Sequence, residues 1–258
     1  MITLFTTTKP FHGLAATHQL NALNSWMQLQ PTPTVVVFGT EDGTGKVCRQ
    51  LNLKHVPTVP TDEHGLPMLS FMFMVSQGFS DTEFMCYINA DIIILEGLIE
   101  ATRLVDDKFP GGFLGVCRRW DIDLDEPLES QIDWHGIVRE RIQHGKLYTP
   151  CSSDLFLFKK PLRWSLPPFT AGRPKWDNWM LWAACENNIP VVDLTEAVIV
   201  AHPNHGYGAN GQIGQKAWRG HASGERNEKL SGGKVFCMKH VRKAGNLWRL
   251  VDGEVIKS

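Results

Sequence analysis

Several features that would place this chain in a membrane, on a nucleic acid or outside the cell are missing from its 258 residues. No apolar run approaches the roughly 18 residues of a membrane span, and residues 1–5 lead into a β-like run without the basic segment of a secretory leader. The 26 basic residues face 27 acidic ones, a net charge of −1, so nothing favours general attraction to nucleic acid or anionic lipid. We expect no membrane span, no nucleic-acid partner and a cytoplasmic location.

Common metal-binding and cofactor motifs are missing as well. The six cysteines lie far apart, without a C-x-x-C pair or a Cys/His cluster at zinc spacing. We interpret them as small buried thiols in a reducing compartment. G-x-G-x-x-G, the P-loop, G-x-S-x-G and H-E-x-x-H do not occur. Any chemistry must therefore rest on a less common arrangement of residues.

The balance of 43% hydrophobic and 21% charged residues is typical of a globular protein. In the first half, apolar runs typical of buried strands alternate with helical patterns. Strands are expected at 4–8, 34–38, 54–56 and 84–89, and helices at 17–29, 46–51 and 67–77. This alternation predicts an α/β fold whose mostly parallel sheet is covered by helices on both faces. Such sheets bind ligands at the carboxyl ends of their strands.

The second half is less regular and rich in tryptophan, with eight of the nine tryptophans at or after Trp120. The segments 164–182 and 201–233 are crowded with Gly, Pro, Asn and His, a composition typical of functional loops. Asp252-Gly253 separates two short apolar runs and predicts a C-terminal hairpin. No repeat or linker occurs, so we expect one domain, 1–258, with a C-terminal elaboration.

The strand expected at 84–89 ends in Asn89-Ala90-Asp91 and is followed at once by more apolar residues. This spacing places the Asp91 carboxylate where the ligand cleft of the sheet opens. A carboxylate there can hold Mg²⁺ or Mn²⁺ together with water and phosphate oxygens, and Asn89 can hydrogen-bond a ribose. Alternatively, Asp91 only caps a helix that starts near Ile93.

A second candidate is Asp177, which follows a Gly- and Pro-containing turn at the start of an expected helix. A carboxylate held there can take the proton of a sugar hydroxyl as a bond forms. Trp176 and Trp179 offer flat apolar faces to a pyranose ring. The alternative is an N-capping aspartate beside core tryptophans.

Two histidines, His202 and His205, follow a strand-like run at 197–200. Neutral imidazoles at this spacing can contact phosphate or ligate a metal, although two ligands without a third nearby do not make a zinc site. Because His202 follows the strand directly, we assign it a structural role and take His205 as the ligand candidate.

Weaker candidates follow other strands of the predicted sheet. Hydroxyl groups after the first strand and an acid after the second can hydrogen-bond a nucleotide, and two arginines after the strand at 113–117 can balance a diphosphate. These residues are Thr6, Thr7, Thr8, Glu41, Arg118 and Arg119. Loops at strand ends are polar in any case, so each residue alone carries little weight.

Taken in order, six segments of this chain resemble those of GT-A-like glycosyltransferases. The resemblance runs from residue 3 to about residue 233. The segments are 4–11, 37–39, 87–93, 118–121, 172–179 and 202–207. The family implies a nucleotide-diphospho-sugar donor, a divalent metal (Mn²⁺ or Mg²⁺) and transfer of the sugar to a hydroxyl of a glycan or another acceptor.

The resemblance also implies roles for single residues. Asp91 matches the metal-binding carboxylate of the DXD-type motif, with Asn89 in the first, more usually acidic, position. Asp177 matches the general base of inverting enzymes, and His205 the histidine that completes the metal or diphosphate site. Thr40 stands where the family often has an acid, which leaves that nucleotide contact to Glu41.

The sequence therefore predicts a metal-dependent, inverting glycosyltransferase. Residues 1–120 are expected to serve the nucleotide sugar and 121–258 the acceptor. Two alternatives are a sugar nucleotidyltransferase, which typically opens with a Gly-rich loop that 6–11 lacks, and a carbohydrate- or nucleotide-binding protein without catalytic activity.

Overall fold

The computed structural model describes residues 1–78, 81–129, 131–205 and 220–258, in which nine strands from both halves of the chain form one sheet. In spatial order they are β13 (Glu254–Lys257), β12 (Leu247–Val251), β10 (Val191–Asp193), β6 (Leu114–Val116), β9 (Leu155–Lys159), β4 (Phe84–Ile88), β1 (Ile2–Thr7), β2 (Thr34–Phe38) and β3 (Lys54–Val56). Neighbouring strands are parallel except around β9, which is antiparallel to β4 and β6, and in the hairpin of β12 and β13.

A smaller sheet brings together segments that lie far apart in the sequence. Its strands are β5 (Ile93–Glu96), β11 (Ile199–Pro203), β7 (Trp120–Ile122) and β8 (Lys146–Leu147). Ala201 of β11 pairs with Ile93 of β5, and His202 pairs with Asp121 of β7. This register places the segment after β4 beside the end of β11.

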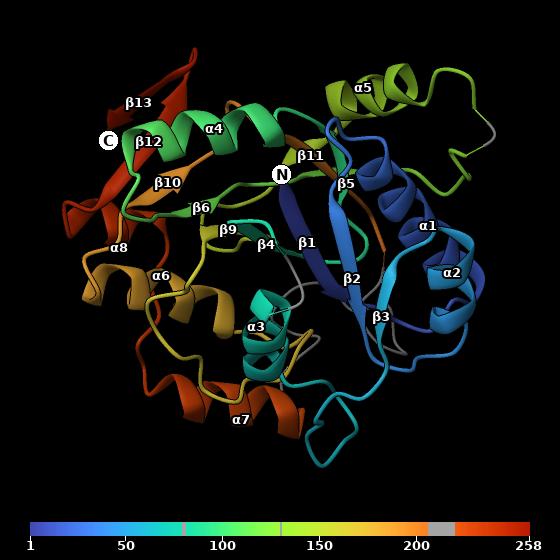
Figure 1. Cartoon of the computed structure of the whole chain (residues 1–258), viewed down its shortest axis with the longest axis horizontal. Helices are drawn as coiled ribbons and strands as arrows, with labels where there is room; N and C mark the ends of the chain where they lie inside the picture. The colour runs from blue at the N-terminus through green and yellow to red at the C-terminus, as the bar shows by residue number, and fades with distance from the viewer. Residues whose placement is uncertain (79–80, 130, 206–219) are drawn as a thin grey trace.

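Helices cover both faces of the large sheet. They are α1 (Gly13–Met27), α2 (Thr44–Gln50), α3 (Leu69–Gly78), α4 (Leu98–Lys108), α5 (Trp134–His144), α6 (Trp176–Glu186), α7 (Ala222–Ser231) and α8 (Met238–Lys243). In Figure 1, α3, α6 and α7 lie on one side of the sheet and α4 on the other. None of the described helices is long and apolar enough to cross a membrane.

Alternation along the strands explains the two-sided core. Leu4 points into a cluster with residues of α1 and α4, whereas Phe5 points into a cluster with residues of α3, α6 and α8. A strand buried on both faces is continuously apolar, and this is the pattern from which β1, β2 and β4 were predicted. The predicted α/β class with a mostly parallel, helix-flanked sheet is confirmed.

Some predicted elements differ from the structure. The segment after Asp91 is strand β5 and not a helix, because the β-branched Ile92, Ile93 and Ile94 are buried and β5 pairs with β11. The suggestion that Asp91 caps a helix there is therefore wrong. The first helix begins at Gly13, four residues before the predicted start, while the C-terminal hairpin is confirmed.

The cysteines also differ in part from the expectation. Cys48, Cys86 and Cys117 are buried as expected, but Cys151 is exposed, and Cys185 and Cys237 are partly exposed. Of the last resembling segment, residues 206–207 lie outside the described part of the chain.

Candidate active site

A pocket of about 620 Å³ lies at the edge of the large sheet where β1, β2 and β4 end. Its walls come from both halves of the chain, and they include eight of the residues selected from the sequence. These are Thr7, Thr8, Glu41, Asn89, Asp91, Arg119, Trp176 and Asp177. The position agrees with the rule that open α/β sheets bind ligands at the carboxyl ends of their strands.

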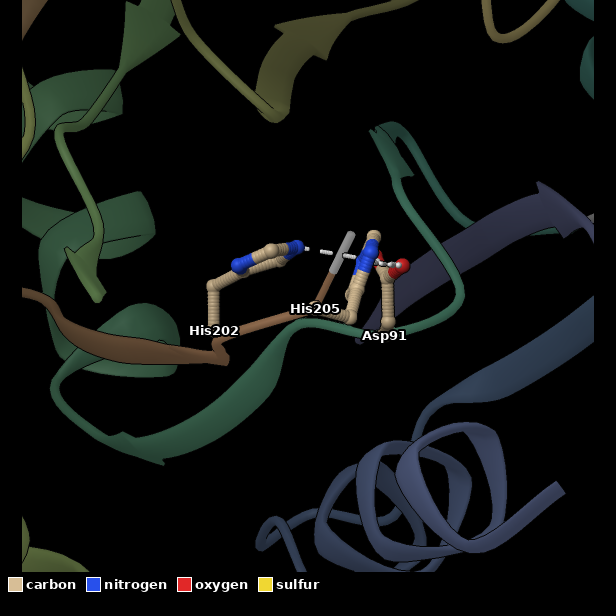
Figure 2. A group of neighbouring side chains, drawn as sticks. All are labelled: Asp91, His202 and His205. Carbon is tan, nitrogen blue, oxygen red and sulfur yellow. Dashed lines mark hydrogen bonds and ion pairs between the residues drawn. The ribbon is translucent and has the colours of Figure 1, made fainter. Parts of the chain in front are cut away.

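Asp91 meets two histidines beside this pocket. Its Oδ2 lies 3.3 Å from Nε2 of His205 and 3.8 Å from Nε2 of His202. Each of Asp91, His202 and His205 offers one possible ligand atom, and these three atoms all lie within 4.8 Å of one another. Figure 2 shows both imidazole rings turned toward the Asp91 carboxylate, which comes from the segment after β4. One carboxylate and two imidazoles are a donor set suited to a divalent transition metal.

Positive and ionisable neighbours keep Asp91 charged. Burial by itself raises the pKa of this carboxyl, but Lys9, His202 and His205 together hold the pKa well below its usual range. Lys9 contributes an ion pair, with Nζ 3.1 Å from Asp91 Oδ2. Asp91 is thus an ionised carboxylate beside the Lys9 ammonium group and two imidazoles.

His202 is more than the structural residue that the sequence predicted. Its side chain is 5% exposed, and it lies between two carboxylates, with Nδ1 3.6 Å from Asp121 Oδ1 and Nε2 facing Asp91. A carboxylate behind a histidine fixes the ring and raises its basicity in many metal sites. The sequence could not supply this third group, because only the pairing of β11 with β5 and β7 brings it near.

Asn89 does not face open solvent but is held by Asp154. Its side-chain Nδ2 donates to Asp154 Oδ1 at 2.7 Å, and its backbone N–H donates to the Asp154 carbonyl at 3.0 Å. Tyr87 also donates its hydroxyl hydrogen to Asn89 Oδ1. The position that is usually acidic in the DXD-type motif therefore carries an amide that anchors the carboxylate of Asp154, the residue just before β9.

Arg119 lies between two acids in the pocket wall. Nη1 donates to Asp154 Oδ2 at 2.6 Å and Nε to Asp121 Oδ1 at 2.9 Å, with the Arg119 side chain only 7% exposed. Its charge is thus matched by two carboxylates of the protein. The hypothesis that it balances a diphosphate stays a prediction, and these contacts give it a part in holding the site together.

Replacing Arg119 by methionine is expected to destabilise the fold by about 3 to 5 kcal/mol, since Asp154 and Asp121 would lose their cation in a largely buried setting. Urea unfolding followed by circular dichroism measures the change. Arg103→Met is the matched control, because Arg103 also pairs with two acids but is 59% exposed. A much smaller loss is expected there, because ion pairs between exposed groups are screened by water. Equal losses of stability in the two variants would contradict the conclusion that Arg119 holds the site together.

Asp177 is the second residue of α6, following Trp176, and it lines the pocket. The helix is capped by Lys175 and not by Asp177, so the interpretation as an N-cap is wrong. The inner face of α6 contains Met180, Leu181 and Ala184, all buried. This packing fixes the position of the carboxylate.

The surroundings of Asp177 move the titration of its carboxyl close to neutral pH. Burial raises its pKa to about 6, and the nearby Asp154 charge adds to this. Hydrogen bonds from the backbone N–H of Asn178 and from the Ser152 hydroxyl, 3.1 Å from Oδ2, act in the opposite direction without cancelling the shift. Carboxylates with such shifted values are suited to proton transfer near pH 7.

With this geometry described, solved structures provide the comparison. The chain is similar to residues 1–349 of TarS from S. aureus in complex with UDP, with 15% identity, a TM-score of 0.51, and coverage of 90% of this chain and 64% of that chain. It is similar to the same degree to glucosyl-3-phosphoglycerate synthase from M. tuberculosis, with 14% identity, a TM-score of 0.51, and coverage of 91% and 80%. The fold is GT-A-like.

A further similarity is to the mannosyltransferase PcManGT from Pyrobaculum calidifontis in complex with GDP-Man and Mn²⁺, with 12% identity, a TM-score of 0.49, and coverage of 95% of this chain and 75% of that chain. No protein-family model and no curated protein matches the sequence. At these identities the similarities concern the fold.

Four of the predicted residues are not among those that line the pocket. One is His205, which contacts Asp91 beside the pocket, and three others lie further away. Thr6 is fully buried, and its hydroxyl donates to the Thr7 carbonyl. Arg118 donates from Nε to the Tyr148 carbonyl at 2.6 Å. Trp179 is 7% exposed and packs against Phe169. Neither Thr6, Arg118 nor Trp179 is among the residues that line the pocket.

The remaining predicted residues reach the pocket in different ways. Trp176 lines it but is only 5% exposed, with its ring packed on Tyr87 and Phe156. Thr7 and Thr8 line it, although their hydroxyls contact the Phe38 carbonyl and Thr44. The roles of these residues and of Glu41 toward a donor or an acceptor stay predictions.

The sequence analysis missed a wall of the pocket that comes from the segment before β9. This wall contains Tyr148, Thr149, Cys151, Ser152, Ser153 and Asp154. Because β9 is antiparallel to β4, it is the start of β9 and not its end that lies at the ligand-binding edge. The apolar run at 155–159 could have been recognised as a strand, but its direction is not encoded locally.

Proposed function

We propose that this protein is a metal-dependent glycosyltransferase that moves a sugar from a nucleotide-diphospho-sugar to an acceptor hydroxyl with inversion at the anomeric carbon. One observation carries the proposal. The same pocket at the ligand-binding edge of a GT-A-like sheet is lined by Asp91 and His202, which His205 contacts from the side, and by Asp177, whose pKa is raised to about 6. The first group suits a divalent cation, and the second suits a general base.

Asp91, His202 and His205 are the residues that would hold the metal. Their two imidazoles favour Mn²⁺ over Mg²⁺, which prefers oxygen ligands. A bound Mn²⁺ supplies Lewis-acid stabilisation of the negative charge on the leaving diphosphate. Asp121, behind His202, would keep that ring in position.

The chain itself offers a second positive charge for the diphosphate. Lys9 lines the pocket, its side chain is 55% exposed, and it reaches Asp91 from the end of β1. The charge of Arg119 is matched by two carboxylates within the protein. We therefore assign the diphosphate contact to Lys9 and not to Arg119. Glu41, Thr7 and Thr8, at the ends of β1 and β2, would contact the nucleoside.

Asp177 would take the proton from the acceptor hydroxyl as its oxygen attacks the anomeric carbon. Ser152 and the first turn of α6 hold the carboxylate in place. Asp177 and Ser152 both belong to residues 121–258, the part of the chain that we propose to serve the acceptor. The similarity to TarS, solved in complex with UDP, supports a nucleoside-diphosphate leaving group.

A donor screen tests this proposal directly. The purified protein is incubated with Mn²⁺ and a panel of nucleotide sugars, and release of nucleoside diphosphate is measured with and without a chelator. Slow, chelator-sensitive hydrolysis of one donor is expected. Production of pyrophosphate from a nucleoside triphosphate and a sugar phosphate would instead identify a nucleotidyltransferase. Binding without turnover would identify a carbohydrate- or nucleotide-binding protein. If NMR of the product showed retention at the anomeric carbon, Asp177 would not be the general base.

The transfer rate should depend on the ionisation of Asp177. Only the carboxylate accepts a proton, so kcat is expected to rise as pH increases through about 6 and to level off above it.

The stability of the fold should change with pH in the opposite sense to the rate. The pKa of Asp177 is higher in the folded than in the unfolded protein. Its contribution to the free energy of unfolding is therefore complete below the ordinary Asp pKa and is lost as pH rises through about 6. Rate and thermal-unfolding profiles between about pH 5 and pH 8 measure both effects.

A further inference from the structure

Two segments of the chain meet at the rim of the pocket, close to Asp177. The backbone N–H of Met238 donates to the Pro150 carbonyl at 3.2 Å. The side chain of Asn178, the residue after Asp177, bridges the same segments, with Nδ2 donating to the carbonyls of Cys151 (2.8 Å) and Phe236 (2.9 Å). Residues 150–151 and 236–238 are thus held side by side by the start of α6.

This arrangement brings two cysteine side chains into contact. The side chains of Cys151 and Cys237 are hydrogen-bonded to each other, and burial together with this contact raises the pKa of Cys151. Cys151 is exposed and lines the pocket, and Cys237 is partly exposed. Both residues are therefore more accessible from solution than the buried Cys86 and Cys117.

A histidine completes the group. Nδ1 of His240 lies 3.2 Å from the Cys237 sulfur and also accepts a hydrogen bond from the Cys237 backbone N–H at 3.1 Å. A ring nitrogen that accepts from an N–H carries no proton, so it can take the proton of the Cys237 thiol. A base in contact with a thiol can accept its proton when the sulfur attacks an electrophile.

We propose that Cys151 and Cys237 are a redox-active thiol pair that forms a reversible disulfide at the rim of the pocket, with His240 as the base for Cys237 and a small disulfide such as glutathione disulfide as the oxidant. The proposal concerns the thiols themselves and does not depend on the transferase activity. Cysteine pairs in reducing compartments are usually of this transient kind.

The chemistry proceeds by two exchanges. His240 accepts the proton of Cys237, and the thiolate attacks one sulfur of glutathione disulfide, breaking its S–S bond and releasing one glutathione thiolate, which is then protonated. Cys151 loses its proton and attacks the Cys237 sulfur of the mixed disulfide, releasing the second glutathione. Two protein thiols have then been oxidised to one disulfide, and one glutathione disulfide has been reduced to two glutathione molecules.

A disulfide here would act on the proposed base, and this consequence rests on the proposed function. Cys151 directly precedes Ser152, whose hydroxyl donates to Asp177 Oδ2. Fixing Cys151 to Cys237 would draw the segment 150–153 toward α8 and alter the contact between Ser152 and Asp177. The Asp91 group belongs to another wall of the pocket, so donor binding should be affected little.

Intact-mass spectrometry and peptide mapping of the full chain test the pair. After incubation with glutathione disulfide, the protein is expected to be lighter by two hydrogen atoms, to yield a peptide linking Cys151 with Cys237, and to return to its original mass with dithiothreitol. Cys237→Ser and Cys151→Ser should each prevent the link. Cys185→Ser, which removes a partly exposed cysteine outside the pair, should leave it unchanged. His240→Asn should slow its formation by about tenfold.

The outcomes separate this inference from the proposed function. Failure to form the Cys151–Cys237 link, or accumulation of a stable mixed disulfide with glutathione, overturns the pair whatever the activity. If the link forms and the reduced protein is a transferase, oxidation should lower kcat about tenfold or more with donor affinity kept. If the link forms and the reduced protein turns over no donor, the thiol pair stands and the proposed function falls.

Discussion

Replacing Asp177 by asparagine is expected to lower the rate of sugar transfer by about 10²- to 10⁴-fold, the usual contribution of a general base. Asparagine has nearly the same shape and can keep the contact with Ser152, but it cannot accept the acceptor's proton. The affinity for the donor, measured by calorimetry, should stay within about twofold of the original, because the substitution removes an interaction made in the transition state and not one that binds the donor. The variant should also lose the rise of stability toward acid pH described above.

The matched control is Glu186→Gln, at the other end of α6. Glu186 belongs to the same helix and is exposed, so the substitution removes an equal charge without touching the pocket. Unchanged kcat is expected there. If Asp177→Asn were as active as Glu186→Gln, Asp177 would not be the base, and a retaining mechanism would become the better explanation.

Replacing Asp91 by asparagine is expected to weaken Mn²⁺ binding by at least about 100-fold, since even the loss of a residue that only supports a ligand costs 10- to 100-fold. The substitution removes the one carboxylate of the Asp91–His202–His205 group and leaves Lys9 and both imidazoles without their shared anion. Calorimetric titration with Mn²⁺, and then with a nucleotide diphosphate in the presence and absence of Mn²⁺, measures the loss.

Two further variants make this result specific. Asp107→Asn removes an exposed carboxylate of α4 that pairs only with Arg103 in the described contacts, and Mn²⁺ binding should be unchanged. Asp121→Asn should weaken it by an intermediate 10- to 100-fold, because Asp121 supports His202 from behind. Nucleotide binding that stays Mn²⁺-dependent in Asp91→Asn would show that the ion is held elsewhere.

The sequence was informative where local pattern and position in the sheet agree. β1, β2 and β4 are buried on both faces, so they appear as continuous apolar runs, and polar residues directly after them had to lie at one edge. That reasoning found Asp91, Glu41 and Thr8. Asp177 was found in a similar way, because a turn of Gly and Pro precedes an amphipathic helical pattern.

The rest depended on contacts between distant parts of the chain. Isoleucines at 92–94 fit a strand or a buried helix equally well, and only pairing with β11, over a hundred residues later, makes them a strand. The same pairing brings His202 to Asp91. Asp154 was missed because its place at the pocket follows from the direction of β9. Trp179 is a core residue because the face of α6 that carries it packs against the sheet.

The position of β9 has a consequence for how the protein is made. The strand lies between β4 and β6 in the sheet although it follows both in the sequence, so a nascent chain that has emerged only as far as residue 120 cannot join these strands. Until residues 155–159 leave the ribosome, β4 presents an open edge, which is an aggregation hazard. Residues 1–120, although continuous in sequence, thus become a finished structure only once the chain has been synthesised well beyond them, as far as β9.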